Sequence, residues 1–195
     1  MSRKEHLTVE GLQKIVAIKA AINLGLSGEL KAAFKDTIPV KRPLVQSQMI
    51  ADPYWLAGFV SGEGCFYVGI KASASHSIGS RVQLVFSITQ HSRDEELMKN
   101  LVSYLGYGKY VPRNNKDFGE FIVSRFDDLT EKIIPFFNKY PILGVKALDF
   151  ADFCEITELM KDKVHLTTEG LNQIRNIKAN MNKGRIQLNN IEDIS

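Results

Sequence analysis

The sequence predicts an α+β domain built on one four-stranded antiparallel sheet, and two observations support this fold class. Four short stretches alternate apolar and polar residues, which is typical of strands with one buried face. These stretches form two hairpins, and segments with helical periodicity precede, separate and follow the hairpins. The expected order is therefore helix, two strands, helix, two strands and a final group of helices.

A helical segment occurs twice, once at each end of the chain. Residues 4–25 (KEHLTVEGLQKIVAIKAAINLG) match residues 163–184 (KVHLTTEGLNQIRNIKANMNKG) at most positions without a gap. Thr8 and Thr167 stand where a helix N-cap is expected. Only one copy of the intervening material is present, so we expect residues 1–25 to be a closing helix left from a preceding repeat.

The remaining boundaries follow from proline and glycine positions. Residues 26–50 read as a linker that starts as a weak helical turn and becomes extended around Pro39 and Pro43. Asp52 and Pro53 then form a strong helix start. We expect one domain over residues 51–184 and a C-terminal tail over residues 185–195.

Within this domain the elements can be read in order. The stretch LAGFVSGEG ends a small-residue helix, and CFYVGIK and RVQLVFSIT form the first hairpin around the loop ASASHSIGS. A helix follows, with Ser92 as the expected N-cap and Gly106 at its end. GKYVPR and EFIVSRF form the second hairpin, and DDLTEKIIPFFNKY and GVKALDFADFCEITELMKDK are helices before the repeated one.

Composition narrows the protein class but leaves the function open. The chain has 195 residues, a net charge of +3 and two cysteines without disulfide or metal spacing, which favours a reducing compartment. No apolar run is long enough for a membrane span, and the N-terminus lacks the apolar core of a secretory signal. The mild positive charge is compatible with nucleic acid and equally with many other proteins.

The two faces of the predicted sheet differ in chemistry. One face carries large apolar residues that are expected to pack on helices: Phe66, Val68, Ile70, Val82, Leu84, Phe86, Ile88, Tyr110, Phe121 and Val123. The opposite face carries Cys65, Tyr67, Gly69, Lys71, Arg81, Gln83, Val85, Ser87, Thr89, Lys109, Val111, Arg113, Glu120, Ile122 and Ser124. This second face is either an ordinary solvated surface or a nucleic-acid-reading surface, because its charge is mostly positive and its polar groups suit phosphates and base edges.

The small-residue helix has one charged residue at its end. Gly58 and Gly62, with Ser61 beside them, leave a nearly bare helix face that suits either tight packing within the domain or a second, equivalent helix. Two such helices would bring two Glu63 carboxylates together, which requires a neutralising cation such as Mg²⁺. A metal pair next to a phosphate-binding face is an arrangement for phosphodiester hydrolysis.

The stretch WLAGFVSGEGCFYV resembles the signature of the LAGLIDADG homing endonucleases. The likeness continues through FSITQHSRDEELM, YLGYGKY, VSRFDDL, FFNKYPILGVKALDFADF and LTTEGLNQIRNIKANMN, and so covers nearly all of residues 51–184. It is closest to the C-terminal half of single-chain, two-motif enzymes of fungal mitochondrial introns. The resemblance implies the αββαββα fold of this family, with a saddle-shaped sheet.

The resemblance also implies roles for individual residues. Glu63 would bind the divalent metal, helped by the Gly62 carbonyl, while Gln90 would help order metal-bound water and Lys146 would assist near the scissile phosphate. Without a catalytic role, Gln90 would be a strand-end cap and Lys146 a surface charge at a helix start. His76 and His91 are interpreted as ordinary surface histidines, since no zinc or triad spacing surrounds them.

The implied function is sequence-specific, Mg²⁺-dependent hydrolysis of double-stranded DNA, with Mn²⁺ or Ca²⁺ as other divalent ions. Since this chain carries one motif, the second LAGLIDADG domain comes from a homodimer or from a missing N-terminal half. The alternatives are an intron RNA maturase and a half-domain that binds DNA without cleaving it. The resemblance further implies a mitochondrial location and no membrane partner.

Overall fold

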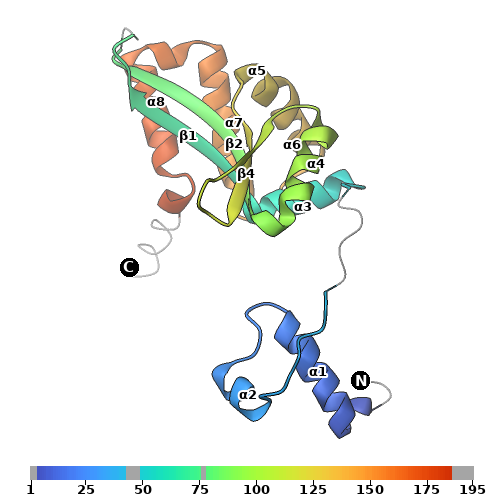
Figure 1. Ribbon diagram of the computed structural model, residues 1–195. Coiled ribbons are helices and arrows are strands. Elements are labelled where there is room, and N and C mark those ends of the chain that lie inside the picture. Colours follow the sequence, from blue (N-terminus) through green and yellow to red (C-terminus); the bar gives the residue numbers. More distant parts are fainter. Residues whose placement is uncertain (1–3, 43–48, 76–77, 186–195) are drawn as a thin grey trace, which may run out of the picture. The chain divides into compact units, whose positions relative to one another are not determined.

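The computed structural model describes residues 4–42, 49–75 and 78–185. The chain divides into two compact units, residues 1–47 and 48–195. Figure 1 shows both units, and each is described here by itself.

The first unit consists of one longer helix with a shorter segment folded onto it. Its elements are η1 (Glu5–Leu7), α1 (Val9–Ala21) and α2 (Gly28–Ala33). An extended stretch follows α2, where the Val40 amide donates to the Ala17 carbonyl of α1 at 3.2 Å and the Arg42 guanidinium donates to the Ala21 carbonyl. The predicted linker therefore contains a short helix, which Ser27 caps at its N-terminus. Residues 43–48 of that linker lie outside the described residues.

The second unit is built on one antiparallel sheet. Its strands are β1 (Gly64–Ala72), β2 (Ser80–His91), β3 (Lys109–Pro112) and β4 (Phe118–Val123), in the spatial order β1-β2-β4-β3. Both predicted hairpins are present, and they are joined side by side through β2 and β4. Helices cover one face of the sheet (Figure 1).

The helices of this unit largely follow the predicted order. They are α3 (Pro53–Glu63), η2 (Ser92–Asp94), α4 (Glu95–Leu105), α5 (Phe126–Asp128), the π-helical segment η3 (Leu129–Ile133), α6 (Ile134–Lys139), α7 (Lys146–Lys161), η4 (Val164–Leu166) and α8 (Thr168–Ala179). None of the helices in the described part of the chain is both long and apolar enough to cross a membrane.

One predicted cap is wrong. Ser92 does not cap α4, because a 3₁₀ turn occupies residues 92–94 and α4 begins only at Glu95. The His91 ring instead accepts a hydrogen bond from the Arg93 amide at 3.1 Å and so caps this turn. The exposed His91 therefore has a local structural role, while His76 lies outside the described residues.

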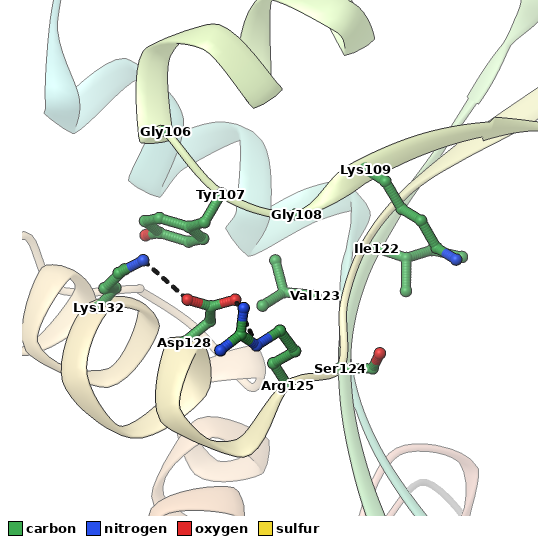
Figure 2. A pocket seen from close by; sticks show the side chains of 10 residues that line it. All are labelled: Gly106, Tyr107, Gly108, Lys109, Ile122, Val123, Ser124, Arg125, Asp128 and Lys132. Atoms are coloured by element: carbon green, nitrogen blue, oxygen red, sulfur yellow. Dashed lines mark hydrogen bonds and ion pairs between the residues drawn. The ribbon is translucent and has the colours of Figure 1, made fainter.

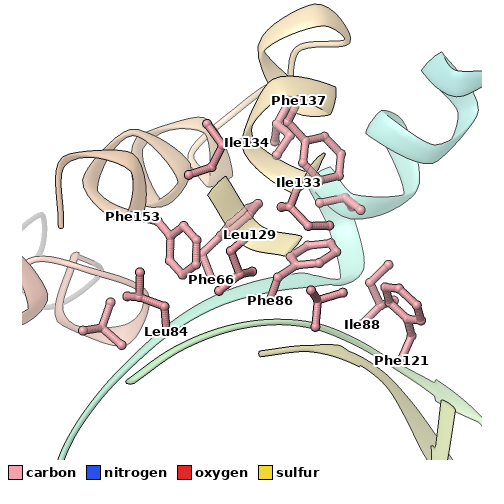
Figure 3. Close-up of a cluster of buried hydrophobic side chains, with 14 of the residues drawn as sticks. Phe66, Leu84, Phe86, Ile88, Phe121, Leu129, Ile133, Ile134, Phe137 and Phe153 are labelled. Atoms are coloured by element: carbon pink, nitrogen blue, oxygen red, sulfur yellow. The ribbon is translucent and has the colours of Figure 1, made fainter. Parts of the chain in front are cut away.

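The core lies between the sheet and the helices. Figure 3 shows aromatic rings from the strands meeting those from the helices. Phe66 of β1 packs against Phe86 of β2 with ring centroids 5.2 Å apart, and against Phe153 of α7 at 5.3 Å. All three rings are fully buried, and each contributes about 1.5–3 kcal/mol of burial free energy. The strand residues predicted to face the helices form this cluster or pack against it.

The repeated segment adopts the same local structure twice. Lys4 and Lys163 both have left-handed backbone conformations, with φ of 56° and 58°. A 3₁₀ turn follows each lysine, and the hydroxyls of Thr8 and Thr167 each accept a hydrogen bond from a glycine amide at 3.0 Å. The sequence repeat is therefore a structural repeat as well.

Candidate catalytic site and nucleic-acid interface

Glu63 lies at the point where α3 changes directly into β1. The Asp52 carboxylate caps the other end of this helix by accepting from the Tyr54 amide at 2.7 Å. At the C-terminal end a side chain at Gly64 would place its Cβ 2.5 Å from a Val60 methyl, so glycine is needed for this tight junction. The Glu63 carboxylate is exposed and has no hydrogen bond or ion pair with any described residue. It also lies at the negative end of the α3 dipole, which favours a cation there.

Gln90 of β2 lies near this junction, as the pairing of β1 with β2 shows. Gly64 pairs with Ile88, so Gln90 extends past the start of β1, where α3 ends. Gln90 pairs instead with Gly119 of β4, and its side chain has the same parity as the buried Ile88. It is half-buried and makes no side-chain hydrogen bond to another described residue.

Lys146 is the first residue of α7, and its charge reaches β1. Burial raises the pKa of the Cys65 thiol, and the nearby Lys146 ammonium partly offsets this effect. A hollow of about 780 Å³ is lined by residues that include Ser61 at the end of α3, Cys65 of β1 and Lys146 of α7. The structure therefore brings Lys146 and the α3–β1 junction to one hollow.

A buried carboxylate beside Lys146 was not identified from the sequence. Asp149 is only 3 % exposed, and its Oδ2 lies 3.9 Å from the Lys146 ammonium. Its Oδ1 accepts from the Asn182 amide at 2.9 Å and from the Arg185 guanidinium at 3.2 Å. A buried carboxylate is stable only with such partners, and Asp149 thereby ties the start of α7 to the end of the domain. The one available signal was an acid one helical turn after Lys146.

The strand register confirms that the predicted polar face is one continuous surface. Directly paired residues of an antiparallel sheet point to the same side, and the pairs are Cys65–Ser87, Tyr67–Val85, Gly69–Gln83, Lys71–Arg81, Ser87–Ile122, Thr89–Glu120, Lys109–Ile122 and Val111–Glu120. Arg113 and Ser124 lie just beyond the ends of β3 and β4.

The charge of this face, hereafter the polar sheet face, is mainly positive. Lys71, Arg81, Lys109 and Arg113 contribute four cations, and Glu120 is the single acid among the fifteen predicted face residues. Glu120 forms an ion pair with Arg113. Gly69 is not open for contact, because the ring of Tyr67 lies 3.1 Å from where its Cβ would be.

A second hollow, of about 460 Å³, lies at the edge of the polar sheet face. Figure 2 shows Lys109, Ile122 and Ser124 on its strand side and Arg125, Asp128 and Lys132 on its helix side. Asp128 forms ion pairs with Lys132 at 2.7 Å and Arg125 at 3.9 Å. Burial and this carboxylate raise the pKa of Tyr107 to about 12. The Lys132 ammonium lies over the Tyr107 ring, 4.8 Å from the ring centroid, in a cation–π contact. Sequence reasoning missed Arg125 and Lys132 because they follow β4, in the turn before α5 and in η3, and so are not part of the strand alternation.

The small-residue face of α3 is open in this chain. Apart from the backbone of α3 itself, no atom of the described residues lies within 4 Å of where a Cβ would stand at Gly58 or at Gly62. Ser61 differs, since its hydroxyl donates to the Ala57 carbonyl at 2.8 Å and accepts from the Leu143 amide at 3.2 Å. Packing within the domain therefore accounts for Ser61 but not for the two glycines.

The comparison with known protein families identifies the family to which this chain belongs. The family model of the LAGLIDADG endonuclease matches residues 56–157, which is more than half of the chain. The chain belongs to the LAGLIDADG endonuclease family. This membership confirms the predicted fold class, and the matched region runs from α3 through most of α7.

Two similar proteins of known sequence are longer than this chain. It is 46 % identical over 175 residues to "Probable intron-encoded endonuclease 3" of Neurospora crassa, and the match covers 89 % of this chain and 33 % of the relative. It is 38 % identical to "Probable intron-encoded endonuclease 2" of the same organism, of which 41 % is covered. The chain thus spans less than half of the length of these two relatives.

Solved LAGLIDADG structures show the same fold with high similarity. The I-SmaMI homing endonuclease bound to cleaved DNA superposes with a TM-score of 0.91 at 51 % identity, covering 95 % of this chain and 62 % of that one. The I-LtrWI homing endonuclease bound to target DNA gives a TM-score of 0.87 at 45 % identity. The 95 % share exceeds the length of the second unit alone, so the match extends into the first unit.

Proposed function

We propose that this chain is one LAGLIDADG domain of a sequence-specific endonuclease that hydrolyses phosphodiesters of double-stranded DNA. The observation that carries the proposal is the arrangement at the end of α3. Glu63 is exposed, has no ion pair with a described residue, and ends the helix whose Gly58 and Gly62 face open space, at the border of a positively charged sheet face. A second LAGLIDADG domain, from a homodimer or a separate half, would pack its own helix on Gly58 and Gly62 and bring a second carboxylate next to Glu63.

The polar sheet face is the proposed DNA-binding surface. Its lysines and arginines would neutralise phosphates, while groups such as Gln83 and Ser87 can hydrogen-bond to base edges in the major groove. The I-SmaMI and I-LtrWI relatives were solved bound to DNA, which supports this assignment. The cations Arg125 and Lys132 extend the surface past β4.

A divalent metal ion fits the donor set at the junction of α3 and β1. Carboxylate and carbonyl oxygens are the ligands that Mg²⁺ prefers, and the last carbonyls of a helix have no intrahelical partner. We assign the Glu63 carboxylate and the Gly62 carbonyl as ligands for Mg²⁺, with Mn²⁺ or Ca²⁺ as other occupants. I-SmaMI was also solved with uncleaved DNA in the presence of calcium ions. A bound ion would supply an activated water and neutralise charge on the phosphate.

Two further side chains have proposed roles near the scissile phosphate. The half-buried Gln90 amide, at the end of β2 and without a side-chain partner among the described residues, would orient the attacking water. The Lys146 ammonium would stabilise negative charge on the phosphate, since it is only partly neutralised by Asp149 at 3.9 Å. Asp149 would act as a positioning residue that holds the start of α7.

The wider assignments rest on the relatives and on the repeat. The LAGLIDADG relatives are intron-encoded endonucleases, and another, 30 % identical, is an "Uncharacterized 50.9 kDa protein in ND4 intron 1" of Podospora anserina. We therefore propose that the protein acts in mitochondria as an intron-homing enzyme. We also propose the organisation that the sequence predicts, with a leftover helix (1–25), a linker (26–50), the endonuclease domain (51–184) and a tail (185–195). Arg185 contacts this domain through Asp149 and Asp152.

The decisive experiment is a cleavage selection on a randomised duplex DNA library with Mg²⁺. The full chain is tested alone and together with a supplied N-terminal half from the Neurospora crassa relative. We expect recovery of a defined cleaved site, and loss of at least about 100-fold in cleavage rate for Glu63→Gln with DNA binding retained. Glu155→Gln, an exposed carboxylate on α7, is the matched control and should cleave like the parent chain.

Other outcomes would assign a different function. Tight RNA binding that is insensitive to Glu63→Gln, with no DNA cleavage in either arrangement, would favour an intron RNA maturase. Specific DNA binding without cleavage in either arrangement would identify a non-cleaving half-domain. A monomer in sedimentation that cuts only with the supplied half would exclude the homodimer.

A further inference from the structure

The Asp149 carboxylate lies between two cations, one at the start of α7 and one after α8. The Lys146 ammonium is 3.9 Å from Oδ2 of Asp149, which is a loose ion pair beyond hydrogen-bond distance. The Arg185 guanidinium donates a hydrogen bond to Oδ1 at 3.2 Å. The closer contact of this carboxylate is therefore with Arg185, and Lys146 is held only weakly.

The position of the carboxylate itself is fixed from the backbone. Asp149 is buried, and the Asn182 amide donates to its Oδ1 at 2.9 Å. The Asn182 side chain also donates to the Phe66 carbonyl of β1 at 3.2 Å, which holds the segment after α8 against this strand. Asp149 is therefore a fixed negative charge between the two cations.

Arg185 is shared between two carboxylates of α7. It forms ion pairs with Asp149 and with Asp152, and its side chain is 17 % exposed, so water and salt screen these contacts only partly. Without Arg185, Lys146 would be the one cation paired with Asp149 among the described residues. Coulomb attraction would then draw the ammonium onto the carboxylate.

The sequence repeat shows that the turn after α8 does not itself require a cation. Asn23 and Asn182 occupy the same position of the two copies, and both have left-handed backbones with φ of 51° and 54°. Three residues later the first copy has Leu26, whereas the second copy has Arg185. The turn is thus shared by the two copies, and the cation belongs only to the copy that lies beside Asp149.

Lys146 borders the space next to the α3–β1 junction. The hollow of about 780 Å³ is lined by Lys146 and Asp149 and also by Ser61, two residues before Glu63. An ammonium held tightly on Asp149 has its charge compensated within the domain, whereas a loosely held one can pair with an anion in the hollow. The strength of the Lys146–Asp149 pair therefore determines how much positive charge Lys146 can offer to such an anion.

We propose that Arg185 is a positioning residue, which keeps the Lys146 ammonium loosely held for the scissile phosphate by sharing the charge of Asp149. Lys146 contacts the phosphate, and Arg185 acts only through Asp149. The control of the active site thus extends to the segment after α8, beyond residues 56–157 of the family match. The consequence for cleavage rests on the proposed endonuclease function, whereas the effect of Arg185 on Lys146 does not.

The first test uses the full chain, in the arrangement and on the DNA site that give cleavage in the selection. Arg185→Leu introduces the residue of the first copy. It should lower the single-turnover cleavage rate at saturating DNA by about tenfold and change the Kd for DNA by less than about twofold. Arg185→Lys keeps a cation beside Asp149 and should retain at least about half of the rate. Arg175→Gln removes an exposed cation of α8 and should cleave like the parent chain.

A double variant shows whether Arg185 acts through Lys146. Once Lys146→Ala has removed the ammonium, adding Arg185→Leu should lower the rate by less than about twofold further. Equal losses in the two backgrounds would overturn the proposal, and so would an unchanged rate for Arg185→Leu alone. Arg185→Gln, which keeps hydrogen-bond donors for Asp149, replaces the leucine variant if that variant does not fold.

The second test requires no cleavage. Acylation of Lys146 by an amine-reactive ester is followed by mass spectrometry in the chain alone, with the exposed Lys161 as internal reference. Arg185→Leu should slow acylation of Lys146 at least about threefold, because an ammonium held on a carboxylate loses its proton less readily, and Asp149→Asn should accelerate it. Unchanged acylation in Arg185→Leu would overturn the proposal. Slowed acylation in a chain that never cuts DNA would uphold the control of Lys146 by Arg185 and contradict the proposed endonuclease function.

Discussion

Gly170 illustrates how a single missing side chain permits the turn that begins α8. The 3₁₀ segment η4 crosses over the start of the helix, and the Gly170 amide bonds to the Thr167 hydroxyl. A Cβ at this position would lie 2.0 Å from the Val164 carbonyl oxygen. Gly11 has the same arrangement in the first unit, where its Cβ would lie 1.8 Å from the Glu5 carbonyl oxygen. The glycine in both copies therefore reflects a close backbone approach.

Gly170→Ala should lower the free energy of unfolding by about 1–3 kcal/mol, because the backbone of η4 has to move away from the helix. Urea denaturation of the full chain measures this change. Gln173→Ala, at an exposed position of the same helix, should change stability by less than about 0.5 kcal/mol. Equal free energies of unfolding for the two variants would show that η4 can move away from the added Cβ without loss of stability.

At the scale of elements, α3 combines two functions that follow from its residue types. Leu56 and Val60 are buried in the core, whereas Gly58 and Gly62 face open space. One side of the helix therefore holds it to the sheet, and the other side leaves the backbone bare. Two glycines inside a helix lower the stability of that helix. Close packing of another helix on the bare backbone would offset this loss.

Gly58→Ala should consequently have effects of opposite sign on the chain alone and on the pair. Stability of the chain alone should rise by about 0.5–1 kcal/mol in urea denaturation, because alanine is the better helix former and its Cβ meets no atom. Association with a second LAGLIDADG domain, followed by sedimentation, should weaken because the helices can no longer approach closely. Unchanged association would contradict the proposed seam.

At the scale of the whole molecule, cations that are far apart in the sequence come together on one face of the sheet. The net charge is only +3, yet the polar sheet face gathers cations from β1, β2 and β3 and from the residue just after β3. The opposite side of the sheet is apolar and packed. A small net charge therefore coexists with a surface suited to a polyanion.

Removing cations from this face should reduce the salt dependence of DNA binding. Lys71→Ala and Arg81→Ala should each lower the slope of log affinity against log salt concentration by about 0.9, provided that each residue neutralises one phosphate. Fluorescence anisotropy over a salt titration gives the slope. Lys161→Ala, on α7 and paired with Glu158 at 2.7 Å, should leave it unchanged. An equal loss of slope in all three variants would indicate non-specific charge attraction.

The fold class, the strand faces and the repeat can all be read from the amino-acid sequence. Period-two alternation assigns Phe66 and Phe86 to the core and Lys71 and Arg81 to the other face, because the pleat alternates strictly and one face is buried. The N-caps at Asp52, Thr8 and Thr167 were also predictable, since capping depends on neighbouring residues alone.

The contacts between residues that lie far apart in the chain became visible only in the folded structure. The contacts of Asp149 with Asn182 and Arg185 join positions 33 and 36 residues apart, and no local pattern encodes such a meeting. The wrong cap at Ser92 arose because His91, at the end of a strand, supplied the acceptor instead. Leu12 and Ile15 of α1 match Leu171 and Ile174 of α8 in the sequence repeat, and only the packing shows that the first two are exposed while the second two are buried.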